Sequence, residues 1–161
     1  MLLRIILAAI LVLPAQAVLA STVSGRPVVV DGDSLELRGE RIRLNGIDAV
    51  EGPQECLDAR GRPWACGRAA AAALQAFLDE ALPTVCEEID RDQYDRMIAV
   101  CWRADGVEVN AWLVAKGWAL DYTRHSGGAY AKLEAAAAAE GLGIWAGSFA
   151  APSQWRQGHR R

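Results

Sequence analysis

Three acidic residues in the first third of the chain could bind a cation and activate a water molecule. Asp33 lies in the segment Asp31-Gly32-Asp33-Ser34 at a predicted strand, and Asp48 and Glu51 come just past the end of another strand. Two carboxylates with carbonyl and water oxygens are the ligands that a hard cation such as Ca²⁺ prefers. Asp-Gly is also a common turn dipeptide, so these acids, considered alone, are more typical of ordinary turns.

Two arginines could hold a phosphate group. Arg43 precedes Asp48 by five residues, and Arg96 begins a predicted strand whose inward face includes Ile98, so we expect Arg96 to point inward at the mouth of a barrel. The guanidinium fork matches phosphate oxygens, and two arginines beside a carboxylate-bound cation could hold a phosphate from two sides. Considered alone, each arginine fits better in a solvated Arg–Asp pair, such as Asp95 with Arg96.

The elements that must position these residues are predicted from the residue pattern. Short apolar stretches broken by Asp-Gly and Arg-Gly-Glu predict β-strands with turns over about residues 28–44. Alternation places Asp33 on the core face with Leu35 and Leu37, where an isolated carboxylate needs a cation or hydrogen-bond donors. Gly32 inside this pattern predicts a bulge that re-aims a side chain. A polar, Gly- and Pro-rich loop follows over about residues 48–67.

Helices and further strands follow this loop. Apolar spacing predicts helices over about residues 68–82, 110–116 and 130–140, with Asn110 as the N-terminal cap of the second. Strands are predicted over about 84–90 and 96–102, joined by a polar turn. Together these elements predict an α+β domain built on a small five-stranded β-barrel with three α-helices. We expect the C-terminal tail, 152–161, to be loosely held.

Composition indicates one exported domain. The chain has 161 residues, 52% hydrophobic and 23% charged, which is typical of a single packed domain. Residues 1–20 have the pattern of a signal peptide, with cleavage after Ala17 or Ala20, so we expect a periplasmic or secreted domain over 21–161 and no membrane segment after signal removal. That domain has 16 basic and 20 acidic residues, and this balance argues against nucleic-acid binding by bulk charge.

The four cysteines predict two disulfides, because an exported protein meets an oxidising compartment. Three pairings exist. We favour Cys56–Cys66 with Cys86–Cys101, since symmetric closure of the polar turn places Cys86 opposite Cys101. A zinc site is the alternative, but no pair of cysteines has the two-to-four-residue spacing of zinc ligands.

In combination, the charged residues fit a known family. The segment Asp-Gly-Asp-Ser at 31–34 is followed by Arg-Leu-Asn-Gly-Ile-Asp-Ala-Val-Glu at 43–51 and Asp-Gln-Tyr-Asp-Arg at 92–96. Val-Asn-Ala-Trp-Leu-Val-Ala-Lys-Gly at 109–117 and Gly-Leu-Gly-Ile-Trp at 141–145 come later. Over about residues 28–147 the chain resembles the staphylococcal nuclease (thermonuclease) family. The first two motifs and the Tyr-x-Arg motif are specific in combination, although each alone is weak.

The resemblance implies a five-stranded OB-type barrel with three helices. It also implies Ca²⁺-dependent hydrolysis of DNA and RNA without strong sequence specificity, leaving 3′-phosphates. Matched motif to motif, Asp33 and Asp48 would be carboxylate ligands of Ca²⁺, and Ala49 would supply a backbone carbonyl ligand. Glu51 would be the general base, and Arg43 with Arg96 would clamp the phosphate. We expect a monomer that binds its DNA and RNA substrates and no stable protein partner.

Departures from the family pattern bear on activity. Ser34 and Ala49 replace the usual Thr, Val50 replaces Pro, and Asp95 replaces Gly. A main-chain carbonyl survives at Ala49, whereas Val50 predicts a less rigid Glu51 loop and Asp95 predicts weaker phosphate binding. The alternative function is a catalytically idle OB module that binds single-stranded nucleic acid, oligosaccharide or a protein. Retention of all five charged positions favours the enzyme, and the negative net charge slightly favours the alternative.

Overall fold

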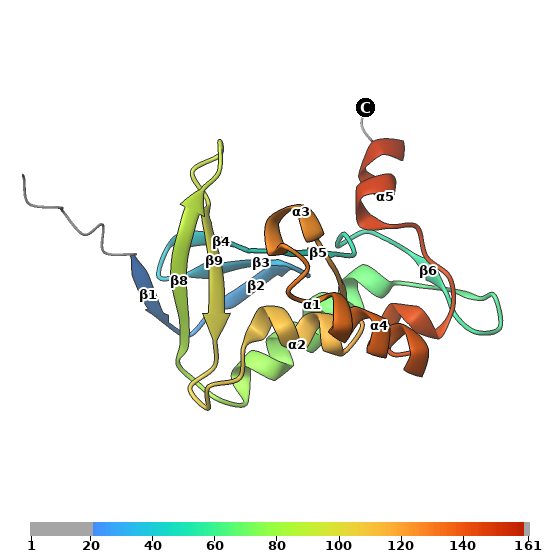
Figure 1. The fold of residues 1–161 in the computed structure, drawn as a ribbon, viewed down its shortest axis with the longest axis horizontal. Coiled ribbons are helices and arrows are strands. Elements are labelled where there is room, and N and C mark those ends of the chain that lie inside the picture. The colour runs from blue at the N-terminus through green and yellow to red at the C-terminus, as the bar shows by residue number, and fades with distance from the viewer. Residues whose placement is uncertain (1–20, 160–161) are drawn as a thin grey trace, which may run out of the picture.

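A curled sheet of six strands forms the body of the domain (Figure 1). The computed structural model describes residues 21–159, so the predicted signal peptide lies outside the described residues. In sheet order the strands are β1 (Thr22–Gly25), β8 (Thr84–Arg91), β9 (Met97–Trp102), β4 (Glu40–Leu44), β3 (Ser34–Leu37) and β2 (Val28–Asp31). Strand β1 also contacts β3, which indicates that the sheet curls towards a barrel.

One strand pair in this sheet is parallel. Strands β4 and β9 run in the same direction, with Arg43 opposite Ile98, whereas the other pairs are antiparallel. The β2–β3 pair shifts register between Val29 and Asp31, so the strand irregularity falls before Gly32. The bulge predicted at Gly32 is misplaced, because Gly32 lies in the turn that joins the two strands. Two short ladders complete the described strands: β5 (Ile47–Ala49) pairs with β10 (Ala119–Asp121), and β6 (Cys56–Leu57) pairs with β7 (Pro63–Trp64).

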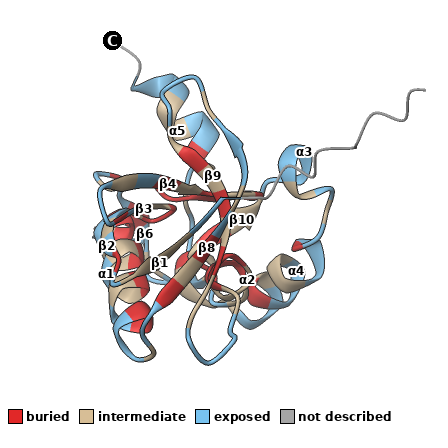
Figure 2. Cartoon of the chain, turned by 90° about the vertical axis from the view of Figure 1, so that its left-hand side faces the viewer, coloured by how far each residue is buried: buried red, intermediate tan, exposed pale blue. Residues whose placement is uncertain are grey.

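Helical segments accompany the strands, and two of them supply most of the helical side of the main hydrophobic core. The helical segments are α1 (Cys66–Asp79), α2 (Val109–Ala115), α3 (Thr123–Ser126), α4 (Ala131–Glu140), the 3₁₀ helix η1 (Gly143–Ala146) and α5 (Pro152–Gly158). Leu74 of α1 and Leu113 of α2 belong to the same buried core cluster as Leu35 and Ile42 of the sheet. Figure 2 shows the buried positions in red along the strands, α1 and α2. Within residues 21–159, no helix is long and apolar enough to cross a membrane.

The predicted fold class is confirmed, but the element count was too low. The structure is a mixed α+β, OB-like domain, yet it contains short additional strands and the helices α3 and α5. Helix α1 ends at Asp79 rather than near residue 82, because the helical conformation is unfavourable for Leu82, the residue that precedes Pro83. The prediction that the C-terminal tail is loosely held is wrong for residues 152–158. These residues form α5, which begins with a proline in its first turn.

Asn110 is not the cap that the sequence predicts. It lies within α2, whose N-cap residue is Glu108, and its side chain is fully buried. The Asn110 amide nitrogen donates to the Asn45 carbonyl at 2.8 Å, and its oxygen accepts the Cys101 amide at 3.2 Å. The side chain thus satisfies backbone groups where β4 and β9 end, and it joins α2 to the parallel strand pair.

Both predicted disulfides are present. Cys86 and Cys101 face each other across β8 and β9, and Cys56 of β6 bonds to Cys66 at the start of α1. These bonds pair every cysteine of the chain, so the zinc alternative is wrong.

We expect thiol titration of the denatured, non-reduced protein to detect no free thiol. The double substitution Cys56→Ser, Cys66→Ser should lower the free energy of unfolding by about 3 kcal/mol, because the bond limits the freedom of the unfolded chain. Urea denaturation followed by tryptophan fluorescence measures this difference. Two titratable thiols in the wild-type protein would contradict the pairing.

Candidate active site

Asp33 is a buried carboxylate with three neighbouring donors. It is 4% exposed and lies just before β3. Its Oδ1 accepts hydrogen bonds from Arg43 Nη1 at 2.8 Å and from the Ser34 hydroxyl at 3.1 Å, and its Oδ2 accepts one from the Ala49 amide at 3.3 Å. Burial raises the pKa of Asp33 to about 6, although Arg43 opposes the shift. The expectation of a core-facing acid that needs donors is confirmed.

Gly32 allows strand β5 to approach Asp33. A Cβ at Gly32 would lie 2.8 Å from the Ala49 Cβ, closer than side chains pack. Gly32 and Asp33 form the turn between β2 and β3, and in this turn Asp33 meets the Ala49 amide and the arginine of β4. Asp33 and Asp48 therefore reach one site although they come from different strands.

Arg43 links the two buried carboxylates. Its Nη1 donates to Asp33 at 2.8 Å, and its Nη2 lies 3.5 Å from Asp48 Oδ1. Asp48 is 6% exposed, so both acids are largely withdrawn from water. The guanidinium offsets part of the cost of burying two like charges.

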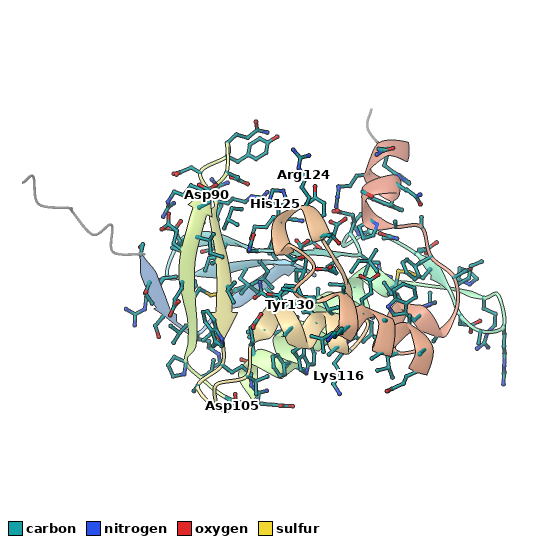
Figure 3. The ribbon with its side chains drawn as sticks, viewed as in Figure 1. Asp90, Asp105, Lys116, Arg124, His125 and Tyr130 are labelled. Carbon is teal, nitrogen blue, oxygen red and sulfur yellow. A yellow bond between two sulfur atoms is a disulfide. The ribbon has the colours of Figure 1, made fainter. Side chains whose placement is uncertain are left out.

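Arg43 and Arg96 line one cavity of about 390 Å³. The parallel β4–β9 pairing sets Arg43 opposite Ile98, two residues beyond Arg96, and so brings the two arginines together. Asp90 and His125 lie on opposite walls of this cavity, one on β8 and the other on α3 (Figure 3). Tyr122 also lines it. The cavity walls carry arginines, the acids Asp90 and Asp92, and aromatic and apolar side chains, and the cavity is large enough for a nucleotide-sized ligand.

The Arg96 side chain is held by Asp92. Arg96 Nε donates to the Asp92 carboxylate at 2.7 Å, and the Arg96 amide donates to it at 2.9 Å. Burial acts to raise the pKa of Asp92, but these hydrogen bonds outweigh it and leave the pKa below its ordinary value. Asp95 is exposed and has φ of 61°, a conformation that glycine adopts at lower cost.

Glu51 lies on a loop that is fixed by backbone contacts. The Glu51 amide donates to the Gln54 side-chain oxygen at 3.2 Å, and its carbonyl accepts the Gln54 amide at 2.8 Å. A Cβ at Gly67 would lie 1.8 Å from the Glu51 carbonyl oxygen, so only glycine lets the first turn of α1 pack on this loop. The fully buried Gln54 and the close contact at Gly67 support the loop even though Val50 replaces proline.

Arg156 of α5 joins the acids, and sequence reasoning missed it. Its Nη1 donates to Asp48 at 2.8 Å and to Glu51 at 2.6 Å, and its Nη2 donates to Asp48 at 3.2 Å. Hydrogen bonds to Asp48 and then to Glu51 raise the pKa of Arg156 above its already high value, against the effect of burial. Only the proline at the start of α5 signalled a helix there, and no residue pattern placed it against β5.

A comparison with models of protein families shows to which family the chain belongs. A family model described as staphylococcal nuclease homologue matches residues 41–147. The chain belongs to the family of staphylococcal nuclease homologues. The matched residues include Arg43, Asp48, Ala49, Glu51 and Arg96, whereas Asp33 and α5 lie outside them.

Two relatives of this nuclease homologue carry different names. The chain is 45% identical over 126 residues, 78% of its length, to the succinoglycan biosynthesis protein ExoI of Rhizobium meliloti (strain 1021), and it covers 66% of that protein. It is 32% identical over 114 residues to an uncharacterized endonuclease of Escherichia coli O157:H7, which covers 68% of the chain and 67% of the relative. The chain thus spans about two thirds of each relative.

The donor set in this nuclease homologue suits a hard cation. Asp33 and Asp48 are buried carboxylates. Ala49 follows Asp48 in β5 and offers its backbone carbonyl oxygen. All of these groups offer oxygen, which Ca²⁺ prefers over nitrogen and sulfur. Among residues 21–159, no three His, Cys, Asp or Glu side chains converge on one point, so the carboxylate ligands would be Asp33 and Asp48 alone.

Proposed function

We propose that the protein is a Ca²⁺-dependent nuclease that hydrolyses phosphodiester bonds of DNA and RNA without strong sequence specificity, leaving 3′-phosphates. The observation that supports this most is the network in which Arg43 joins Asp33 to Asp48 beside a cavity that also holds Arg96. Membership of the family and the name of the Escherichia coli relative add support.

Each charged residue has a role in the proposed reaction. Glu51 takes a proton from a water molecule as the water oxygen attacks phosphorus. The bond between phosphorus and the 5′ oxygen breaks, which leaves the 3′-phosphate, and the departing 5′ oxygen takes up a proton from solvent. Arg43 and Arg96 offset the charge that develops on the five-coordinate phosphorus centre, and their fixed positions limit the reorganisation this requires. An ionised glutamate is a weak base at neutral pH, so the arginines and the cation supply most of the acceleration.

Ca²⁺ would be held by Asp33, Asp48 and the Ala49 carbonyl, and when bound it offsets charge on a non-bridging phosphate oxygen. With so few charged ligands, we expect weak binding, about 10⁻⁴–10⁻³ M, in the range of extracellular calcium modules. Such affinity suits an exported protein, and the two disulfides favour an oxidising compartment, periplasmic or extracellular.

A nuclease assay with and without calcium tests this function. We expect the purified, oxidised protein to degrade denatured DNA and RNA in millimolar Ca²⁺ and to stop when a chelator is added, because the cation stabilises the transition state. Gel electrophoresis of labelled single strands gives the rate, and end-labelling after phosphatase treatment identifies the 3′-phosphate. Re-addition of Ca²⁺ in excess of the chelator is the control. Unchanged cleavage in EDTA would reject the role of the metal.

An idle binding module is the second candidate, and one observation favours it. The relative ExoI is named for succinoglycan biosynthesis rather than for nucleic-acid cleavage. An oligosaccharide would then occupy the cavity lined by Tyr122 and Arg96. Absence of cleavage with every divalent cation, together with saturable binding of an acidic oligosaccharide, would favour this candidate over the nuclease.

A further inference from the structure

Arg156 bridges Asp48, a proposed cation ligand, and Glu51, the proposed general base. Its guanidinium makes three hydrogen bonds, two to Asp48 and one to Glu51. The arginine cavity is lined by Arg43 and Arg96, whereas Asp48 and Glu51 are not among its lining residues. Asp48 and Glu51 are therefore held by Arg156 of α5 outside the cavity that Arg43 and Arg96 line.

Helix α5 is held against the domain by its N-terminal side. Ser148 exchanges backbone hydrogen bonds with Leu57 at 2.8 and 3.0 Å, and the buried Gln54 side chain donates to the Ala150 carbonyl at 2.7 Å. Pro152 is buried at the start of the helix. These anchors hold the base of α5 close to the Glu51 loop, so Arg156 reaches the acids from a fixed starting point while the rest of the helix projects outward (Figure 1).

Two arginines contact Asp48, and they differ in how easily they can leave. Arg43 is part of β4 and its side chain is 23% exposed, whereas Arg156 is on a peripheral seven-residue helix and its side chain is 35% exposed. Local opening of α5 would carry Arg156 away and free Asp48 without disturbing the sheet. Arg156, rather than Arg43, is therefore the arginine that a cation can displace from Asp48.

We propose that Arg156 is a built-in competitor of the divalent cation: its guanidinium holds Asp48 and Glu51 when the site has no cation, and it leaves when the cation binds. This inference rests on the cation site of the proposed function. Counting each carboxylate as charged, Asp33, Asp48 and Glu51 face Arg43 and Arg156. Departure of Arg156 leaves an excess of two negative charges, which a divalent cation neutralises.

The exchange has two consequences for the nuclease. Arg156 donates a hydrogen bond to Glu51 Oε1, and this positive neighbour makes the Glu51 carboxylate a weaker base until Arg156 leaves. In the cation-free protein, Arg156 therefore holds both the cation ligand Asp48 and the general base Glu51. Binding of the cation releases both residues. The matched family residues end at 147, so the competing arginine lies in a segment beyond the family domain.

Calorimetric titration of the oxidised protein with CaCl₂ tests the competition directly. We expect Arg156→Gln to bind Ca²⁺ about tenfold more tightly than wild type, because charge-assisted hydrogen bonds no longer have to be broken. Arg124→Gln is the matched control: it removes the same charge from α3, on the same upper side of the domain as α5 in Figure 3, and should change the affinity by no more than about twofold, as expected for a solvent-screened charge. Arg156→Lys, which keeps the charge but loses the planar fork, should fall between wild type and Arg156→Gln.

Amide hydrogen exchange in α5 gives a second test, because a change in the net charge of the protein alone would not alter the exchange rates of these amides. We expect the amides of α5, including that of Trp155, which donates to the Ala151 carbonyl at 2.9 Å, to exchange faster in wild type once Ca²⁺ is saturating. Thermal unfolding followed by circular dichroism checks that each variant is folded.

The outcomes separate the two proposals. Equal affinities in Arg156→Gln and Arg124→Gln, or unchanged α5 exchange at saturating Ca²⁺, would overturn the competition while the calcium-dependent nuclease stands. Failure of wild type and Arg156→Gln to bind Ca²⁺ at tens of millimolar would overturn both. Tighter binding in Arg156→Gln alone, with faster exchange in wild-type α5, supports the competition.

Discussion

Substitution of Glu51 by Gln is expected to lower the rate of phosphodiester hydrolysis by about 10²–10⁴-fold, because the amide cannot accept a proton from the attacking water. The shape of the side chain is retained, and its backbone contacts with Gln54 do not depend on the carboxylate. Initial rates on a single-stranded DNA substrate with saturating Ca²⁺ measure the change. The loss should be in kcat rather than KM, since Glu51 acts in the transition state.

The matched control is Glu55→Gln, which removes a carboxylate from an exposed position of the same loop. It should keep the wild-type rate within about twofold, as expected for a surface substitution that removes only a screened charge. Near-full activity of Glu51→Gln, with the wild-type melting temperature, would remove Glu51 from the mechanism and favour a different base.

Arg96→Ala should also lower kcat, by about 10²–10³-fold, because one fixed positive charge is lost beside the phosphorus centre. Arg96 lines the cavity and is held by Asp92, and this pair keeps the guanidinium in place before substrate arrives. Arg96→Lys should recover part of the rate, since the charge remains while the planar fork that matches phosphate oxygens is lost.

Arg62→Ala serves as control for Arg96→Ala. Arg62 is exposed, pairs with Asp58 beside β6 and β7, and is not among the residues that line the cavity. Its substitution should leave kcat and KM unchanged. A decrease in Arg62→Ala equal to that in Arg96→Ala would show that the effect reflects overall charge, and a fully active Arg96→Ala would exclude Arg96 from the reaction.

Local patterns predicted much of the fold because the interactions involved are close in sequence. The Cys86–Cys101 bond follows from one turn whose closure sets the β8–β9 register. The burial of Asp33 follows from strand alternation. By contrast, Asn110 caps nothing, because its side chain serves backbone groups of β9 and of the segment after β4, partners that no local pattern contains.

The site was predictable in its residue types but not in its geometry. Alternation places Arg43 on the face opposite Ile42, and nothing in that pattern tells where Arg96 lies. The parallel pairing of β4 with β9 places Arg96 near Arg43, and that pairing joins segments more than fifty residues apart. Arg156 was missed for the same reason: its partners, Asp48 and Glu51, are 108 and 105 residues away along the chain.

One buried glutamine ties the loop before α1 to the C-terminal segment. The Gln54 oxygen accepts the Glu51 amide while its nitrogen donates to the Ala150 carbonyl, and a buried amide that loses either partner is costly. A chimera that exchanges residues 148–159 for an unrelated sequence would therefore also disturb the loop that carries Glu51. Protein engineers who shorten or fuse this domain at its C-terminal end should keep the stretch through residue 150, or redesign position 54 along with it.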